Sequence, residues 1–451
     1  METRRVAVPD VTPDLPPNAF GKPTKRRWWI LFLISLMYLI AYMDRSNISV
    51  AQPEIAKAFG LTKTQMGVVL SAFTLAYALG QVPAGWLGDR FGPKKVLMVI
   101  MSWWAAAAAL TGAAMGMNSL LGARFLLGLG EAGAFPVASR GMQLWFPRSE
   151  RGRIQGTTHF FSRFAVAVTP LVAGSIMLAF GWRAIFYIFG SLGVVWAVAF
   201  AIIYRNRPEE HSGVNRAELA EIRGVNPDGS IKELSTVYQR TPWKQILGSA
   251  NMWYIALGYG CFFFGTNFYL TWYPTYLREH RHLTVQALGL IGSLPLFAGM
   301  LGDIVGGSLT DIAFKRSGNA KWARRVVAAP GFVLAGIFVI PAAITESAGL
   351  SVLFLAISFF FLEFVIGPAW AVPMDVGGQF SGTVTGIMNM AGALTASLTP
   401  IVYGGLFQRG YWIAPFYVSA GVLFLGALVW LFLIDPERSV VENTNVENTG
   451  R

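Results

Sequence analysis

Long apolar runs, separated by short polar or charged breaks, recur along the chain from Trp28 to Ile434. A helix needs about 20 predominantly apolar residues to cross a bilayer, and runs of that length predict twelve spans. We expect them near residues 28–50, 65–85, 96–116, 119–142, 154–179, 184–204, 252–276, 284–309, 325–344, 350–374, 381–408 and 412–434. The pattern therefore predicts an all-α membrane protein with twelve transmembrane helices.

One long polar interruption divides these spans into two sets of six. It runs from Arg205 to about Ser249 and carries seven Lys or Arg residues. The predicted organisation is an N-terminal tail (1–27), a six-helix half (28–204), a linker (205–250), a second six-helix half (251–434) and a C-terminal tail (435–451). Two halves joined in this way suggest repeats around a central cavity, as in many secondary carriers.

The basic residues lie between the spans, mostly on one side. With the N-terminus in the cytoplasm, that side holds Lys25, Arg26, Arg27, Arg90, Lys94, Lys95, Arg148, Arg151, Arg153, the linker, Lys315, Arg316, Lys321, Arg324 and Arg325. Cytoplasmic loops carry an excess of Lys and Arg. We therefore expect both termini in the cytoplasm of a multi-pass protein of the cell membrane, the inner membrane in a bacterium. The polar stretch 1–27 argues against a signal peptide in the first span.

Composition narrows the function classes. Only 13% of residues are charged, 54% are hydrophobic and the mean hydropathy is +0.49. The net charge of +12 does not indicate nucleic-acid binding, because the basic residues cluster between spans. The lone Cys261 excludes a disulfide framework or a cysteine metal site within one chain. The sequence has no phosphate-binding glycine loop, metal-ligand cluster or nucleophile elbow, so we expect no cofactor, no metal, no ATP-driven transport and no enzyme activity.

The loop after the second span contains Gly85-Trp-Leu-Gly-Asp89-Arg90-Phe-Gly92-Pro-Lys94-Lys95. It resembles the signature of the major facilitator superfamily, G-x3-D-[RK]-x-G-x-[RK]-[RK]. A degraded echo, Gly307, Asp311 and Lys315-Arg316, follows the eighth span. The resemblance implies the major facilitator fold, with Gly85, Asp89, Arg90 and Asp311 in loops that set the conformational equilibrium. An alternative is that Asp89 and Arg90 serve topology alone.

Three further segments resemble the anion:cation symporter family of that superfamily. They are Tyr42-Met-Asp44-Arg45-Ser-Asn47, Arg124-Phe-Leu-Leu-Gly128-Leu-Gly130-Glu131-Ala-Gly133-Ala-Phe-Pro136, and Trp145-Phe-Pro147-Arg148-Ser-Glu150-Arg151-Gly152 followed by Gly181-Trp182-Arg183. The family includes carriers of galactonate, glucarate, hexuronates, tartrate and phthalate, and animal relatives that carry glutamate or sialic acid. The resemblance implies transport of a small carboxylate anion.

Six ionisable residues fall inside predicted spans, where each costs several kcal/mol unless it is paired or hydrated: Asp44, Arg45, Arg124, Glu131, His159 and Arg163. Arg124 and Glu131 are about two helical turns apart and share one face. An Arg fork matches a carboxylate and stays charged, which makes Arg45 and Arg124 candidate substrate anchors. The alternative is an internal salt bridge with Asp44 or Glu131 that has no transport role.

A carboxyl group can release its proton when anion binding changes its partner. Asp44 and Glu131 are therefore the candidate proton carriers, and the family resemblance points to the same positions. His159 and Arg163 lie one turn apart on the fifth span. Three inward Arg residues would favour a dianion such as phthalate; alternatively, Arg163 extends to an interface or packs on the first span.

Aromatic walls with few polar groups suit a benzene ring, whereas a sugar acid needs many hydrogen bonds. We expect Tyr77, Asn267, Trp370 and Asn389 to contact the substrate; Trp370 and Asn389 resemble substrate contacts of sugar-acid members. Asp303, Glu363 and Asp375 receive no role at this stage. The predicted function is monomeric, proton-coupled uptake of a small organic anion, best a dicarboxylate such as phthalate. The alternatives are a sugar-acid symporter, an anion exchanger or exporter, and an anion-binding receptor.

Overall fold

The computed structural model of the chain describes residues 21–226, 229–232, 240–283 and 292–441. Residues 1–20 and 442–451 of the two expected tails, and residues 284–291 at the start of the predicted eighth span, lie outside the described residues. The regular secondary structure of the described residues is helical, apart from one isolated antiparallel β-bridge between Val225 and Ile231.

Long helices form two halves with a short-helix linker between them. The first half has α1 (Arg26–Phe59), α2 (Lys63–Phe91), α3 (Pro93–Gly112), α4 (Met117–Ala132), α5 (Ala134–Trp145), η1 (Arg148–Glu150), α6 (Arg151–Phe180) and α7 (Trp182–Ile203). The linker has η2 (Pro208–Glu210), α8 (Arg216–Arg223) and α9 (Trp243–Gly248). The second half has α10 (Ala250–Thr271), α11 (Tyr273–Thr275), η3 (Tyr276–His280), α13 (Leu294–Ser317), α14 (Ala320–Ile344), α15 (Ala348–Glu363), α16 (Ile366–Val376), η4 (Gly378–Phe380), α17 (Ser381–Gln408), α18 (Ala414–Leu428) and η5 (Val429–Leu433).

Eleven helical segments of the described residues are long and apolar enough to cross a membrane. They coincide with all of the predicted spans except the seventh, which is α10. This helix has 22 residues, and asparagines, glycines and tyrosines reduce its apolar character. It nevertheless packs in the bundle against α17 and α18, so the chain has the architecture of twelve spans.

The fourth and tenth spans are each broken in two, although the sequence pattern predicted continuous helices. The breaks lie at Gly133, between α4 and α5, and at Phe364 and Val365, between α15 and α16. Each break lies three or four residues before a proline, Pro136 and Pro368. A proline has no N–H for the carbonyl four residues earlier, so both breaks have the same physical cause.

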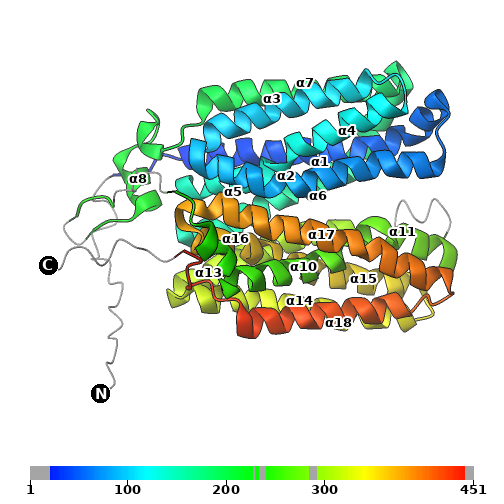
Figure 1. Cartoon of the computed structure of the whole chain (residues 1–451). Coiled ribbons are helices and arrows are strands. Elements are labelled where there is room, and N and C mark those ends of the chain that lie inside the picture. Colours follow the sequence, from blue (N-terminus) through cyan, green and yellow to red (C-terminus); the bar gives the residue numbers. More distant parts are fainter. Residues whose placement is uncertain (1–20, 227–228, 233–239, 284–291, 442–451) are drawn as a thin grey trace.

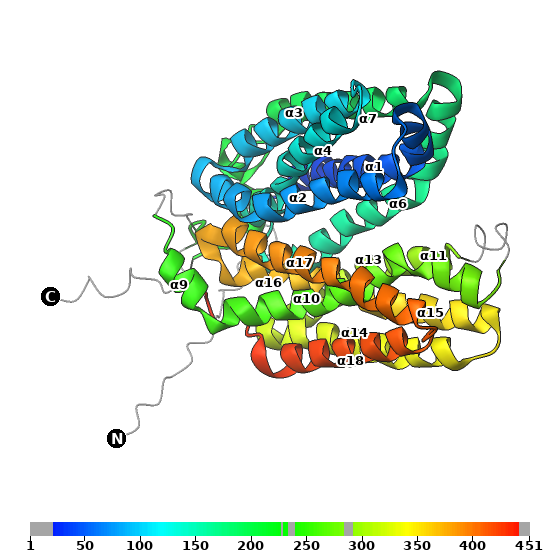
Figure 2. The same ribbon diagram turned by 45° about the vertical axis from the view of Figure 1, so that its right-hand side comes forward.

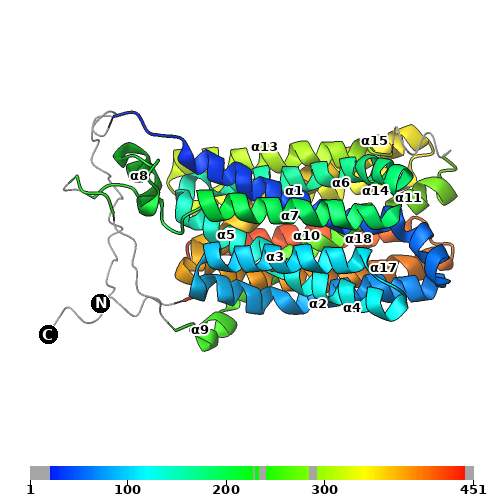
Figure 3. The same ribbon diagram turned by 90° about the horizontal axis from the view of Figure 1, so that it is seen from above.

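The helices of both halves run roughly along one axis, and α8 lies beyond their ends (Figures 1 and 3). Helices α8 and α9 lie at the same end of the bundle (Figure 3), and the start of the described chain contacts α8, because Thr24 N donates to Asn215 Oδ1 at 3.1 Å. We call this end the terminal face. The halves contact each other mainly where α2 meets α17 and where α6 meets α13.

Both contacts between the halves are made by glycines near the terminal face. A Cβ at Gly85 of α2 would lie 2.3 Å from the carbonyl oxygen of Gly382 on α17. A Cβ at Gly152 of α6 would lie 2.7 Å from the carbonyl oxygen of Gly307 on α13. Any larger residue would push the helices apart, so these glycines allow the two halves to close at this face.

Candidate functional site

A cavity of about 650 Å³ lies between the halves, lined by residues of both. From the middle of the bundle, near Arg45 and Asn389, its lining reaches Val50, Pro170 and Pro274, which lie far from the terminal face along their helices. Figure 2 shows the two halves diverging toward that opposite face. The cavity therefore extends away from the termini, and the glycine contacts lie at its closed end.

Arg45 of α1 and Arg163 of α6 are the two described arginines that line the cavity. Arg45 Nε donates to Glu131 Oε2 at 2.6 Å, and its guanidinium lies 4.2 Å from the ring centre of Tyr77, 5.0 Å from that of Phe135 and 5.1 Å from that of Tyr42. The rings hold the guanidinium by cation–π contacts. Glu131 is fully buried behind it, so the ion pair has one side facing the cavity and one side facing the protein.

Asp44 and Arg124 lie behind this pair and do not line the cavity. Asp44 accepts hydrogen bonds from Trp104 Nε1 at 2.7 Å and from Asn47 Nδ2 at 3.2 Å. Arg124 lies with its guanidinium 4.7 Å from the ring centre of Phe73, and its Nε and Nη1 have no hydrogen-bond partner among the described residues. The structure thus places Arg124 one layer deeper than a direct contact with cargo in this state.

Glycines of α4 bring these charges close to α2 and α3. A Cβ at Gly128 would lie 2.3 Å from the carbonyl oxygen of Phe73, and one at Gly130 would lie 2.5 Å from Trp103 Cδ1. Both glycines belong to the segment from Arg124 to Pro136 that resembles the anion:cation symporter family. They let the fourth span pack without intervening side chains, and so place both charges near α1.

The fifth span contributes His159 and Arg163, which both line the cavity. Arg163 Nη2 donates to Glu363 Oε1 of the second half at 2.8 Å, so this guanidinium is paired across the halves. The His159 ring lies 4.9 Å from that of Trp370, and Trp370 Nε1 donates to the hydroxyl of Tyr259 at 2.8 Å. These side chains form an aromatic wall with a cation beside it.

Asn389 of α17 donates from Nδ2 to the hydroxyl of Tyr77 at 3.1 Å and to Gln81 Oε1 at 2.8 Å. Tyr77 and Asn389 both line the cavity, on opposite halves. Asn267 does not line it: its Nδ2 donates to the carbonyl oxygen of Ala396 at 2.6 Å, which joins α10 to α17. Of the four polar and aromatic candidates, only Asn267 lies outside the cavity.

Asp89 connects the halves at the terminal face. It accepts from the backbone N–H of Gly382 at 2.9 Å, and from the backbone N–H and the hydroxyl of Thr383 at 2.6 Å each. Arg140 Nε lies 3.8 Å from its Oδ1. Asp89 therefore caps the N-terminus of α17, where an anion is favoured. Arg90 is exposed, and its guanidinium lies 5.2 Å from the ring of Trp86 on its own helix.

Asp311 makes the matching contact at the other junction. It accepts from the backbone N–H of Gly152 at 2.9 Å and of Arg153 at 2.6 Å, at the start of α6. Arg324 Nη1 also donates to it, at 2.9 Å. Asp311, in the degraded second copy of the loop motif, thus makes the same kind of contact as Asp89 in the first copy. One aspartate of each half caps a helix of the other half.

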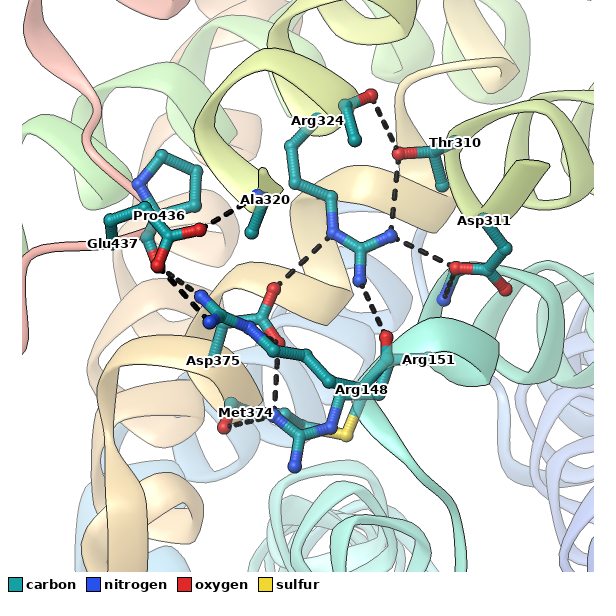
Figure 4. Close-up of polar contacts among 12 residues, drawn as sticks. Arg148, Arg151, Thr310, Asp311, Ala320, Arg324, Met374, Asp375, Pro436 and Glu437 are labelled. Atoms are coloured by element: carbon teal, nitrogen blue, oxygen red, sulfur yellow. Dashed lines mark hydrogen bonds and ion pairs between the residues drawn. The ribbon is translucent and has the colours of Figure 1, made fainter. Parts of the chain in front are cut away.

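A network around Asp375 adds a third connection (Figure 4). Its buried carboxylate accepts from Arg151 Nη1 at 2.9 Å and from Arg324 Nε at 3.2 Å, and Arg148 Nε lies 3.3 Å away. Nearby, Asp435 accepts from Lys321 Nζ at 2.7 Å. Partial burial raises the pKa of Asp435. This hydrogen bond and one from a backbone N–H lower it by more, so the pKa lies below its ordinary value.

Sequence reasoning missed part of the wall. Tyr42, Ser46, Ser49 and Val50 line the cavity with Arg45, and their spacing of three, four, seven and eight residues places them on one helix face. That face could have been read from the sequence. Glu363 was left without a role, although Glu131 and Glu363 are each followed five residues later by a proline. This shared pattern could have marked the second glutamate.

Among the described residues, no group of three or more His, Cys, Asp or Glu side chains could hold a metal ion. The polar groups that line the cavity are two arginines, a histidine, hydroxyls, an indole N–H and one amide, and the carboxyls of Glu131 and Glu363 pair with the two arginines. Such groups bind an anion and exchange protons, and none of them forms a covalent catalytic pair in the contacts above.

Comparisons with known proteins point to one family. The sequence matches the Major Facilitator Superfamily over residues 34–400. A protein of Cupriavidus necator named "Probable sulfoacetate transporter SauU" is 40% identical over 91% of this chain and 94% of its own. A Bacillus subtilis protein named "Probable galactarate/D-glucarate transporter GudP" is 32% identical over 93% of this chain and 94% of its own.

Two solved structures share the fold. The human organic anion transporter MFSD10 superposes with a TM-score of 0.70 at 13% sequence identity, over 90% of this chain and 100% of the other. The transporter FucP in the outward conformation gives a TM-score of 0.69 at 14% identity, over 90% and 99%.

Proposed function

This chain belongs to the major facilitator superfamily and is a secondary transporter of organic anions, and on that basis we propose that it takes up a small dianion together with protons. The observation that carries the proposal is the ion pair of Arg45 and Glu131. The arginine faces the cavity, whereas the carboxylate is buried and has one oxygen, Oε1, without a partner among the described residues.

Anion binding and proton binding are linked through this pair. An anion that approaches Arg45 from the cavity competes with Glu131 for the guanidinium. Once displaced, Glu131 would be a buried carboxylate without a counter-ion, which is strongly unfavourable. It therefore takes up a proton as the anion binds. Asp44, held by Trp104 and Asn47 instead of by an arginine, is the second candidate for a transported proton.

The charge balance of the bundle interior supports proton coupling. Three arginines and four carboxyls lie buried or half-buried in the middle of the described bundle: Arg45, Arg124, Arg163, Asp44, Glu131, Asp303 and Glu363. With every group ionised, the net charge is three minus four, or −1. Charges interact strongly in such a poorly solvated region. Because the carboxyls outnumber the arginines, no positive charge is left to balance an added anion, and protons must enter with it.

Two arginines on one cavity wall favour a cargo with two acid groups. Arg45 and Arg163 both line the cavity, and a guanidinium binds carboxylate or sulfonate oxygens by paired hydrogen bonds. Sulfoacetate, named for the C. necator relative, carries one carboxylate and one sulfonate. Phthalate carries two carboxylates on a ring that suits the walls formed by Phe263 and Trp370. The aldarates named for the B. subtilis relative are the alternative class.

The direction in which the cavity opens supports an outward-open state. We assign the terminal face to the cytoplasm, because the basic residues gather in its loops and linker. The cavity then faces the outside, and the contacts of Asp89, Asp311 and Asp375 close the cytoplasmic side. Transport consists of anion and proton binding from outside, opening of these contacts, and release inward. One chain contains the whole cavity, so we propose that a monomer transports.

A ligand screen followed by transport assays tests the proposal. Purified protein is heated with sulfoacetate, phthalate, glucarate and galactonate, and the melting temperature is recorded. The best ligand is then loaded against an imposed pH gradient in proteoliposomes. Glu131→Gln should keep binding and exchange but lose proton-driven accumulation. Undiminished accumulation in this variant would remove Glu131 from coupling. Asn267→Ala, outside the cavity, is the matched control and should accumulate the ligand normally.

A further inference from the structure

Two acidic groups of the second half meet one arginine of the first half. Asp303 on α13 and Glu363 at the end of α15 are both fully buried. Arg163 donates to Glu363 at 2.8 Å. Helix α6, which carries Arg163, packs so closely on α13 that a Cβ at Gly156 would lie 2.1 Å from the carbonyl oxygen of Asp303.

The two carboxyls are neighbours across α13 and α15. The Glu363 side chain lies over Gly299 and Gly302, and Cβ atoms at these glycines would lie 3.1 Å from its Cγ and 3.2 Å from its Cβ. Within the described residues, no N–H or O–H group donates to either oxygen of Asp303 or to Glu363 Oε2. Asp303 directly follows Gly302 in α13, so the two buried carboxyls lie side by side where the helices meet. Two carboxylates can only accept hydrogen bonds, so such a pair can bond to each other only when one of them carries a proton.

The net charge of the cluster also indicates that the carboxyl pair carries a proton. One guanidinium with two ionised carboxyls would leave a net charge of −1 in a region from which water is excluded. Closely spaced carboxyls in such a site share a proton instead of both ionising. One proton on the pair makes the cluster of Arg163, Asp303 and Glu363 neutral.

We propose that Asp303 and Glu363 form a second proton-binding site, which holds one proton while Arg163 is bound and takes up another when Arg163 leaves. This inference rests on the proposed proton-coupled function and adds a transported proton to it. When the halves move, the Arg163–Glu363 bond breaks and the Glu363 carboxylate accepts a proton from the aqueous phase. Arg163 stays a guanidinium, and the bound anion replaces Glu363 as its counter-ion.

The cluster spans the two halves, which makes it suited to coupling. Arg163 lies on α6 of the first half, and the two carboxyls lie on α13 and α15 of the second. Relative motion of the halves therefore separates the arginine from the carboxyls. The other titratable or charged groups facing the cluster are His159 on α6, Tyr42 on α1, and Tyr259 and Tyr269 on α10. None of these is a carboxylate, so the pair itself is the group that binds protons.

Infrared spectroscopy of the purified full-length protein tests the resident proton without any substrate. The spectrum of the wild type minus that of Asp303→Asn should contain the carbonyl-stretching band of a protonated carboxyl, shifted in D2O. Wild type minus Glu363→Gln should show the same band, because Asp303 then ionises beside Arg163. Asp375→Asn is the matched control: its buried carboxylate is bound by arginines, so its difference spectrum should lack the band. Absence of the band in the first two differences would overturn the proposal.

The second proton is measured in proteoliposomes with sulfoacetate as the probe. The number of protons moved per anion, from the reversal potential, should fall by one in the double variant Asp303→Asn/Glu363→Gln while uptake continues, because neither carboxyl is then left to take up a proton. An unchanged number would overturn the second site. Glu131→Gln in parallel distinguishes the two proposals: if it still accumulates sulfoacetate, the first coupling site fails, whereas the infrared result on Asp303 and Glu363 is unaffected.

Discussion

Replacing Asp89 with asparagine should shift the protein toward the state that is open at the terminal face. The carboxylate accepts three hydrogen bonds from Gly382 and Thr383, at 2.6 to 2.9 Å. Asparagine keeps one acceptor, turns an amide donor toward the other N–H and removes the charge at the helix N-terminus. Losing about one charge-assisted bond and one dipole interaction costs about 2–3 kcal/mol. At 1.4 kcal/mol per factor of ten, the open population rises about 30- to 150-fold.

Thiol alkylation measures this population. The only native cysteine, Cys261, is buried and is replaced by alanine. Ser139, fully buried and hydrogen-bonded to Gln155 between the cavity and the terminal face, is replaced by cysteine. Its alkylation rate reports opening of the terminal face, and it should rise in Asp89→Asn by the factor given above.

Arg90→Gln is the matched control. It removes a neighbouring charge whose side chain is exposed and lies against Trp86 of the same helix, α2. It should leave the alkylation rate unchanged. An equal rate in wild type and Asp89→Asn, or an equal increase in Arg90→Gln, would refute the assignment of Asp89 to closure.

Four further outcomes are expected. Gly85→Ala should also raise the Ser139→Cys alkylation rate, since its Cβ would lie 2.3 Å from the Gly382 carbonyl oxygen; an unchanged rate would mean that the contact adapts. Arg124→Ala should abolish sulfoacetate binding in the melting assay, because Asp44 and Glu131 lose a buried positive neighbour; retained binding would contradict this. Arg163→Ala should remove stabilisation by dianions more than by galactonate; equal loss would argue against a two-arginine site. Asp435→Asn should lower the melting temperature at neutral pH. The melting temperatures of the wild type and the variant should converge as the pH falls through the native pKa of Asp435, because a carboxyl with a lowered pKa stabilises the folded protein only above that pH. A difference that stays constant with pH would refute the role of the ion pair.

The sequence predicted much of the fold because membrane spans follow from length and apolarity alone. It also identified Arg45, Tyr77, His159, Arg163, Trp370 and Asn389 as candidates, and the structure places all six on one cavity. Polar side chains inside apolar spans are costly, and this cost makes them visible in the sequence. The substrate-contact roles of these residues and the proton-coupling roles of Asp44 and Glu131 stay predictions.

Other features depend on tertiary contacts that no local pattern encodes. Arg163 and Glu363 are 200 residues apart, and their pairing follows from how α6 and α15 both pack on α13. The depth of Arg124 depends on the close approach of α4 to α2. Asn267 looked like a substrate contact because it is polar, whereas its amide joins two helices of the same half. For such residues the partner decides the role, and the partner is known only from the fold.

The paired glycine contacts of α2 with α17 and of α6 with α13 also bear on the speed of transport. Glycine surfaces have no interlocking side chains, so they can separate without rotamer changes. The kinetic barrier to opening then consists largely of breaking the bonds of Asp89, Asp311 and Asp375 across the halves at once. The maximal turnover rate at saturating anion would thus be governed by contacts at the terminal face that never touch the cargo.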